Sequence, residues 1–266
     1  MLQHEFSLAE LIVAAASEAW RGESEQLVTG IGPLPRLAAG LAKLTHSPGI
    51  MMTDGEALLV EDPIPLGPRG DYKPRYSGWM PYRRVFDTVW SGKRHAMVTP
   101  VQMDRWGQGN ISALGGDLQK PKVAMLGLRG FPGNSICHKN SMFLPNHSKR
   151  TFVEGQVDVV SSVGYRQDNW PEGTRPADVQ IGLIVTNLCI FDFGGPDHAA
   201  RLLSLHPGVS FEEVQDNTGF PLLKPETVGV TQGPTPEQME IIQKLDPHNI
   251  RATVLKGNPP GLRSAA

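Results

Sequence analysis

The polar residues Gln102 and Asp104 have a type and spacing that suit chemistry. They lie two positions apart and follow the apolar run 96–99, so in extended chain their side chains point to the same face. A glycine-containing segment, 107–110, then allows the backbone to turn sharply. Such a pair can either line a substrate site or tie down its own loop, and the residues alone leave both interpretations open.

A second candidate site is the segment Gly130-Phe131-Pro132-Gly133-Asn134, which also follows an apolar run. Glycines let a ligand lie against backbone amides, and such amides can stabilise a developing oxyanion. Removing one donor of this kind typically costs about 10²–10³ in rate. A plain surface turn is the alternative interpretation of the same residues.

The turn Gly30-x-Gly32 lies between an expected strand and an expected helix, where a backbone can meet a phosphate. Pro33 and Pro35 remove amide donors at the positions where a phosphate needs them. A third glycine at dinucleotide-binding spacing is missing. The pattern therefore favours a tight turn required for packing.

Histidine and cysteine usage argues against a metal centre or a thiol nucleophile. None of the 8 histidines falls at metal-ligand spacing, and we expect no metal. The 2 cysteines, Cys137 and Cys189, lie in sequence contexts typical of protein interiors. They are too few for a disulfide framework, which indicates a reducing cytoplasm.

Helices and short strands must position the candidate residues. Capping boxes at Ser7, Ser210 and Thr235 predict the starts of three helices. Apolar runs predict buried strands at 26–29, 96–99, 123–126, 157–160, 181–186 and 189–193. Continuous apolar runs suit a sheet covered on both faces. We therefore expect an α/β fold with three layers, α/β/α, around a mostly parallel central sheet.

The length suits one large α/β domain or two small ones, and we expect one soluble domain over residues 1–266. Hydrophobic residues make up 39% and charged residues 20% of the chain. The net charge of −2 offers no basic field for nucleic acid, and no apolar run reaches the roughly 18 residues needed to span a membrane. The apolar stretch 11–16 lacks preceding basic residues and is a poor signal peptide. The proline-rich segment 61–81 predicts a long ordered excursion with a functional role.

These motifs, in their residues and in their order along the chain, resemble motifs of the β subunit of the family I CoA-transferases. The similarity runs from about residue 7 to 225 and includes that family's first strand and glycine turn, its Gln-Val-Asp segment and its glycine loop. The corresponding stretches are 28–35, 101–110, 130–134, 186–192 and 207–220. The last of these is the most specific. The resemblance implies the CoA-transferase family I fold.

One position departs from the family pattern. The aligned turn reads Met52-Thr53-Asp54-Gly55, and Thr53 stands where the transferases carry the glutamate that attacks the acyl-CoA. A hydroxyl cannot form the same mixed anhydride and enzyme thioester. Asp54 and Glu56 flank the position, but using either as the nucleophile would require a re-aimed backbone.

A subgroup of the family that lacks this glutamate is the most similar. The resemblance implies hydrolytic, retro-Claisen-like opening of the last steroid ring of a cyclic β-keto acyl-CoA, in the cytoplasm. It implies an α subunit that supplies the main carboxylate, an α2β2 assembly, and no cofactor besides the CoA of the substrate. No residue of this chain is a certain catalytic group. The expected substrate-binding residues are Thr53, Asp54, Gly55, Gln102, Asp104, Gly130, Phe131, Gly133 and Asn134.

Two other functions stay open at this point. One is a true acyl-CoA:carboxylate CoA-transferase of the glutaconate type that uses a nearby carboxylate. The other is a non-catalytic partner that only stabilises the α subunit.

Overall fold

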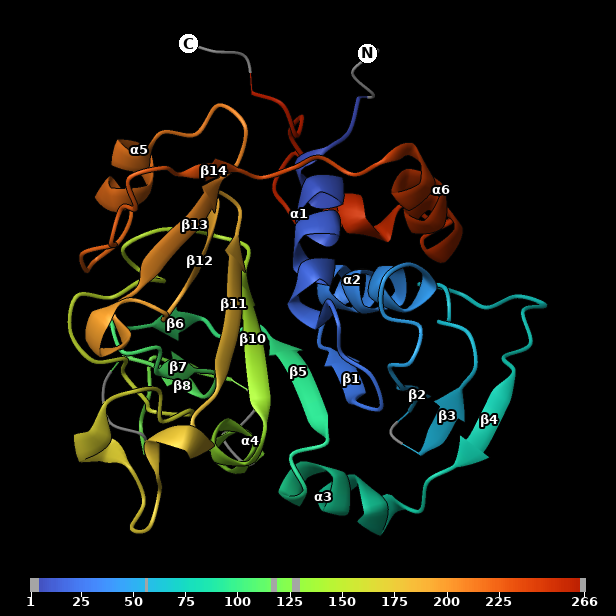
Figure 1. The fold of residues 1–266 in the computed structure, drawn as a ribbon, viewed down its shortest axis with the longest axis horizontal. Coiled ribbons are helices and arrows are strands. Elements are labelled where there is room, and N and C mark those ends of the chain that lie inside the picture. Colours follow the sequence, from blue (N-terminus) through green and yellow to red (C-terminus); the bar gives the residue numbers. More distant parts are fainter. Residues whose placement is uncertain (1–4, 56, 116–118, 126–129, 264–266) are drawn as a thin grey trace. The chain divides into compact units, whose positions relative to one another are not determined.

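The computed structural model describes residues 5–55, 57–115, 119–125 and 130–263 (Figure 1). Residue contacts group the chain into two compact units, one formed by residues 1–98 and 231–266 and the other by residues 99–230. The single domain expected over 1–266 stays a prediction.

The first unit opens with α1 (Leu8–Ser17), which begins at the expected capping box. The Ser7 hydroxyl accepts from the Glu10 amide, and the Ser7 amide donates to Glu10 Oε2 at 2.7 Å. A 3-10 turn, η1 (Glu18–Trp20), continues the helix. All of α1 is buried, and it packs against α2 (Pro33–Leu44) (Figure 1). The helical predictions for this region are confirmed.

Strand β1 (Leu27–Gly30) lies parallel to β5 (Arg94–Val98) and leads through the glycine turn into α2. A Cβ on Gly30 would come within 2.3 Å of the Pro35 carbonyl oxygen, and Gly32 has a φ of 101°. Gly30 is therefore required for the close approach of the backbone at Pro35, and Gly32 for its backbone conformation. The tight packing turn expected from the sequence is confirmed.

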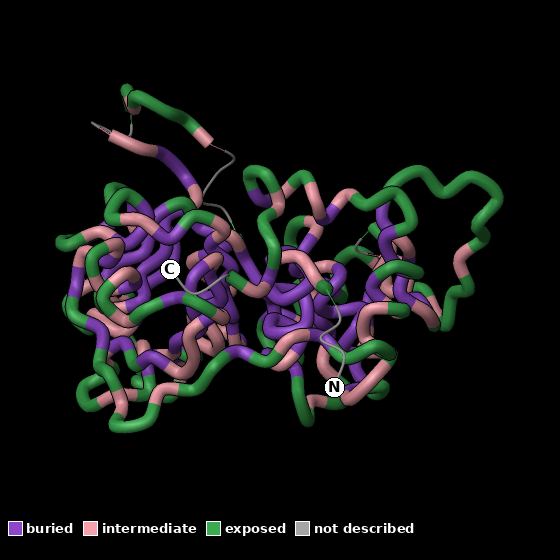
Figure 2. The backbone as a smooth tube through the Cα atoms, turned by 90° about the horizontal axis from the view of Figure 1, so that it is seen from above, coloured by how far each residue is buried: buried purple, intermediate pink, exposed green. Residues whose placement is uncertain are grey.

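A small antiparallel sheet in the same unit consists of β2 (Met52–Asp54), β3 (Leu58–Val60) and β4 (Tyr76–Trp79). The segment 61–81 links β3 to α3 (Tyr82–Trp90) and includes β4. It begins with buried Pro63, Ile64 and Leu66, and most of the rest is exposed (Figure 2). The Leu66 amide donates to the Leu245 carbonyl at 2.8 Å, which attaches the excursion to the C-terminal helix.

The C-terminal part of the first unit consists of α6 (Pro236–Leu245), with the predicted capping box at Thr235, and η5 (Ile250–Thr253). Buried Arg251 forms ion pairs with Glu10 at 2.8 Å and with Asp246 at 3.0 Å. These pairs connect the C-terminal segment to α1. A buried arginine with both partners in place is costly to disturb, because removing one carboxylate leaves its charge unpaired.

The second unit contains a mixed sheet. Strand β10 (Lys139–Leu144) is parallel to β11 (Ile181–Thr186), which is antiparallel to β12 (Cys189–Asp192). Strand β13 (Arg201–Leu205) is antiparallel to β12 and parallel to the short β14 (Gly229–Val230). Phe152 and Phe191 fill the core beside this sheet.

Short elements complete the second unit. They are β6 (Gln102–Met103), β7 (Gly109–Asn110), β8 (Ala113–Leu114), β9 (Val123–Ala124), α4 (Phe131–Cys137), η2 (Gln167–Asn169), η3 (Pro176–Asp178), η4 (Pro196–His198) and α5 (Phe211–Asp216). Strands β6 and β7 form one hairpin, and β8 and β9 form another. Helix α5 starts at the predicted cap, where the Ser210 hydroxyl accepts from the Glu213 amide.

Buried His147 connects the end of β11 to the segment after α5. Its Nε2 lies 2.8 Å from Thr218 Oγ1 and its Nδ1 lies 3.0 Å from Thr186 Oγ1. Each threonine hydroxyl also donates to a backbone carbonyl, that of Thr218 to Val214 and that of Thr186 to Cys189. Burial lowers the pKa of His147 to about 3, so the ring is neutral. Both threonines belong to stretches that resemble the transferases, and both have structural roles.

Some strand and burial predictions are wrong. The run 123–126 forms only β9, whose Val123 and Ala124 are exposed because the hairpin extends from the core, and Leu126 lies outside the described residues. The run 157–160 is a loop that buries Val157 and Val159 without pairing. Of the cysteines, Cys189 is buried and Cys137 only half-buried. Within the described ranges, no helix is long and apolar enough to cross a membrane.

Candidate functional site

The turn that carries Thr53 is the end of the β2–β3 hairpin. Thr53 is opposite Leu59 and Asp54 is opposite Leu58 in the strand register. Gly55 is exposed and has a φ of 58°, a conformation that favours glycine. Of the predicted residues, Thr53 and Asp54 thus end strand β2, and Gly55 begins the turn that follows. Glu56 lies outside the described residues.

Asp54 is held by two side chains from the excursion. Arg69 donates to both carboxylate oxygens, at 3.0 and 2.6 Å, and the Tyr76 hydroxyl donates to Oδ2 at 3.0 Å. The hydrogen bond from Arg69 is the main cause that lowers the pKa of Asp54. A carboxylate with both oxygens engaged in this way is stabilised as an anion, which makes it a poorer nucleophile.

Asp104 is fully buried in the second unit, where backbone amides donate to its carboxylate. Its Oδ1 accepts from the Trp106 and Gln108 amides, each at 3.0 Å, and the Val157 amide also favours its charged form. Burial raises the pKa of Asp104 to about 6, against the opposing effect of the backbone amides. A buried acid that titrates near neutral pH is suited to proton transfer, or to binding a ligand that changes its charge.

Gln102 braces the loops around Asp104. Its Oε1 accepts from Asn110 Nδ2 at 2.8 Å and from the Asp158 amide at 3.0 Å. The loop-bracing interpretation of Gln102 is therefore confirmed. A contact of Gln102 or Asp104 with substrate stays a prediction.

Serines that were not predicted from the sequence extend this network. Ser162 Oγ accepts from the Gly109 amide at 2.8 Å, and Ser161 Oγ lies 2.9 Å from Ser112 Oγ. Adjacent polar residues inside an apolar stretch, 157–163, were the available signal. The hydroxyls hold the β6–β7 hairpin against this stretch, so the position of Asp104 is set by both segments.

Two arginines lie against the ring of Trp106 in the Asp104 loop. The guanidinium carbon of Arg105 is 5.1 Å from the ring centroid, and that of Arg166 is 4.6 Å from it. Arg166 also favours the charged form of Asp104. Two cations held over one aromatic ring can bind an anionic group such as a phosphate. No role was predicted for these residues from the sequence.

The glycine segment forms the cap and first turn of α4. Phe131 is buried, whereas Gly130 is exposed and Gly133 and Asn134 are half-buried. A Cβ added at Gly130 or at Gly133 would meet no heavy atom within 4 Å among the described residues. Packing against the described residues therefore requires neither glycine, and a contact of Gly130 or Gly133 with substrate stays a prediction.

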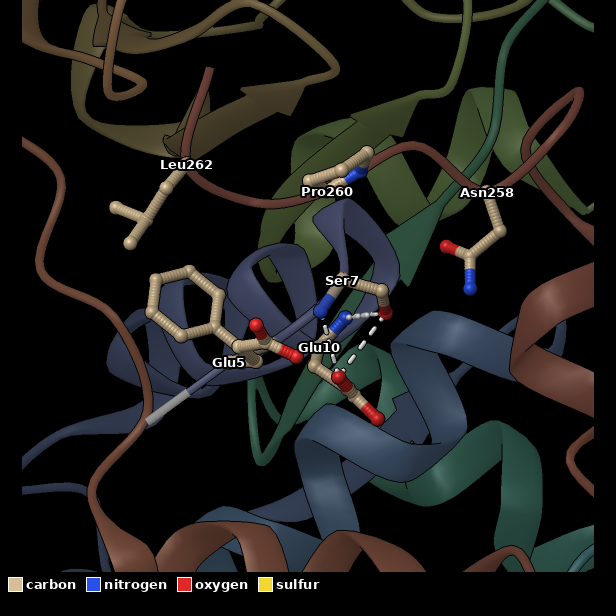
Figure 3. Close-up of a pocket in the computed structure, with 7 residues that line it drawn as sticks. Glu5, Ser7, Glu10, Asn258, Pro260 and Leu262 are labelled. Carbon is tan, nitrogen blue, oxygen red and sulfur yellow. Dashed lines mark hydrogen bonds between the residues drawn. The ribbon is translucent and has the colours of Figure 1, made fainter. Parts of the chain in front are cut away.

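Two pockets lie away from these residues. One, of about 600 Å³, adjoins the start of α1 and is lined by Glu5, Phe6, Ser7, Glu10, Asn258, Pro260 and Leu262 (Figure 3). The other, of about 560 Å³, is lined by Tyr165, Gln167, Pro176, Phe193, Gly194, Gly195, Asp197 and His198. Neither contains a predicted site residue. In the first pocket, Ser7 and Arg251 engage the Glu10 carboxylate, which gives it a structural role.

Among relatives by sequence, the cholesterol ring-cleaving hydrolase IpdB subunit of Rhodococcus jostii is 42% identical over 93% of this chain and 95% of its own length. A 3-oxoadipate CoA-transferase subunit of Pseudomonas knackmussii is 30% identical over 91% of this chain and 94% of its own length. No family model matches the chain.

Solved structures agree with this result. The Rhodococcus jostii IpdAB crystal structure matches with a TM-score of 0.85 and 40% identity, covering 95% of this chain and 99% of that one. Glutaconate coenzyme A-transferase from Acidaminococcus fermentans has a TM-score of 0.77 at 24% identity, covering 92% and 96%. The expected CoA-transferase family I fold is thereby confirmed. Within that class, the chain belongs to the family of the IpdB subunits.

Proposed function

We propose that this chain is the β subunit of a hydrolase that opens the last steroid ring of a cyclic β-keto acyl-CoA. The observation that carries the proposal is the turn of β2, in which the Thr53 hydroxyl replaces the nucleophilic carboxylate of the transferases. The similarity to ring-cleaving hydrolase subunits supports the same conclusion.

The reaction requires no nucleophile from the enzyme. Water adds to the ring ketone, the bond between that carbon and the α-carbon of the thioester breaks, and the electron pair moves into a thioester enolate. The water oxygen stays in the new carboxylate, and the α-carbon then takes up a proton. Such chemistry needs a general base and stabilisation of the developing oxyanion. A hydroxyl in place of the glutamate fits this changed chemistry.

The residues of this chain would shape the binding site. Thr53 and Gly55 would border the thioester, and backbone amides near Gly130 and Gly133 would approach the substrate. Arg105 and Arg166 would contribute positive charge for the phosphates of CoA. No cofactor besides the CoA of the substrate is needed.

A second subunit completes the proposal. The relatives include a subunit named as part of a two-component hydrolase, IpdAB. By analogy, an α subunit would contribute the main catalytic carboxylate, in an α2β2 assembly in the cytoplasm. The low cysteine content supports this location.

True CoA transfer is the second candidate, favoured by the relative named as a 3-oxoadipate CoA-transferase subunit. It would need a carboxylate beside the thioester. Asp54 is the described carboxylate next to Thr53, and Arg69 and Tyr76 already engage its two oxygens. This geometry weighs against acyl exchange through Asp54.

The Thr53→Glu variant tests the proposal, with Thr53→Gln as a control of equal size that lacks the acid. Because ring opening uses water, restoring the carboxylate should give no gain in ring cleavage over the wild-type complex. Turnover of the cyclic β-keto acyl-CoA by the purified two-subunit complex is the measurement. A higher rate in Thr53→Glu than in both other forms would contradict the proposal.

The purely structural role is tested by Thr53→Val, which keeps the shape of the side chain and removes the hydroxyl. Because Thr53 would border the thioester, loss of its hydroxyl should lower kcat/KM in an intact complex. Unchanged turnover would favour a chain that only stabilises its partner.

A further inference from the structure

Helix α3 has one broad apolar face, and the chain covers only part of it. Val85 and Val89 are buried on one side of this face. On the adjoining side, Tyr82, Phe86 and Trp90 follow one another at four-residue spacing, and Tyr82 and Trp90 are 69% and 67% exposed. Residues four apart lie on one side of a helix, so the three rings form a continuous outward stripe.

The strand before α3 adds to this surface. Trp79 at the end of β4 is 70% exposed, and Tyr72 and Tyr76 are also exposed. In the sheet order β2-β3-β4, β4 is an edge strand (Figure 1). We define the aromatic face as these rings together with those of α3: Tyr72, Tyr76, Trp79, Tyr82, Phe86 and Trp90.

The size of the aromatic face suits a protein interface. With 150–250 Å² per aromatic side chain, the exposed fractions correspond to roughly 500–840 Å² of accessible surface. A standard interface buries about 800 Å² on each partner, and tyrosine and tryptophan are enriched in its centre. The aromatic face alone therefore supplies most of the area that a stable complex needs.

The charges around the aromatic face are balanced. Arg84 pairs with Asp87 at 3.0 Å, and Arg75 pairs with Glu61 and Asp62. Such a rim of mixed charges is typical of protein–protein interfaces, whereas binding to an anionic lipid surface favours clustered basic residues.

The aromatic face is also connected to the Thr53 turn. The hydroxyl of Tyr76, one of its members, donates to Asp54 Oδ2 at 3.0 Å. A protein that covers the face thus comes next to the turn in which the transferases carry their nucleophile. We therefore propose that the aromatic face docks the α-type subunit. The inference rests on the proposed two-subunit assembly.

The test compares two double variants of the full-length chain, Trp79→Ser/Trp90→Ser on the aromatic face and Val101→Ser/Leu223→Ser on exposed apolar residues of the other unit. Each is titrated with purified α subunit, and Kd is measured calorimetrically. The Trp variant should bind at least 100-fold more weakly, because interface tryptophans often cost a factor of ten or more each. The control should bind like the wild type. Circular dichroism verifies that each variant is folded.

A second measurement does not rely on substitution. Hydrogen exchange of the wild-type chain with and without α subunit should show new protection in β4 and α3. Equal Kd for the Trp variant and the wild type, or unchanged exchange at 76–90, would overturn the inference. So would a wild-type homodimer that the Trp variant abolishes while α binding persists. If the wild-type chain does not bind the α subunit at all, the proposed assembly itself fails, which is a distinguishable result.

Discussion

Thr53 and Asp54 are neighbours in the same strand, yet their chemistry differs. Thr53 offers a hydroxyl where the transferases have an acid, and Asp54 has an acid that Arg69 and Tyr76 already bind. The replacement at Thr53 was readable from the sequence because the turn is short and aligned. The binding of Asp54 was not, because its partners come from 15 and 22 residues further along a segment without a regular pattern.

The raised pKa of Asp104 predicts how the free energy of unfolding depends on pH. Its pKa is raised to about 6 in the folded chain, so the folded state holds a proton that the unfolded state has released between about pH 4 and 6. Its stabilising effect is present below pH 4 and is lost as the pH rises through 6. Relative to Asp104→Asn, the wild type should lose roughly 2 kcal/mol of unfolding free energy between pH 4.5 and 8. Urea unfolding of both proteins measures the difference, and parallel pH curves would contradict the assignment.

For His147, the predicted change of stability with pH has the opposite sign to that for Asp104. Burial lowers its pKa to about 3, so the unfolded state binds a proton that the folded state rejects below about pH 6.5. Its contribution is complete above pH 6.5 and is lost as the pH falls. His147→Ala should cost about 2–4 kcal/mol at pH 7, because the variant opens a cavity and the ring's hydrogen bonds to Thr186 and Thr218 are lost. The difference from wild type should shrink towards pH 5 in the same unfolding assay, and a constant difference would refute this.

At the scale of elements, the sequence predicted best where local chemistry decides. The caps at Ser7 and Thr235 and the turn at Gly30 were found because one or two side chains set each of them. Pairing partners of short strands were not predictable. Strand β10 was missed because its polar residues Asn140 and Ser141 are buried through hydrogen bonds that apolar periodicity does not reveal.

At this scale, a substitution in the first turn of α4 should affect stability and activity differently. Gly133→Ala adds a methyl group where the chain leaves open space, and alanine favours a helix over glycine by about 1 kcal/mol. The melting temperature should therefore stay the same or rise, while kcat/KM should fall at least tenfold if substrate lies against this backbone. Thermal unfolding and steady-state kinetics of the complex separate the two effects. Full activity in a stable variant would leave the segment as a plain surface turn.

At the scale of the whole molecule, the class of fold was predictable because several motifs occur in the family's order along the chain. Which residues contact the substrate stays a prediction. The turn residues 53–55 lie in one compact unit, and Gln102, Asp104 and the α4 glycines lie in the other. Sequence motifs suggested which residues could belong to a site, and their roles stay predictions. The motifs did not indicate which of their polar atoms the chain itself already uses.

Water incorporation tests the central claim most directly. The wild-type two-subunit complex would be given the cyclic β-keto acyl-CoA in ¹⁸O-labelled water during a single turnover, and the products analysed by mass spectrometry. Hydrolytic ring opening predicts one ¹⁸O in the new carboxylate, CoA still attached to the product, and no CoA on this chain after borohydride trapping. An enzyme–CoA thioester on this chain, with CoA passed to an added carboxylate and no ring opening, would contradict it.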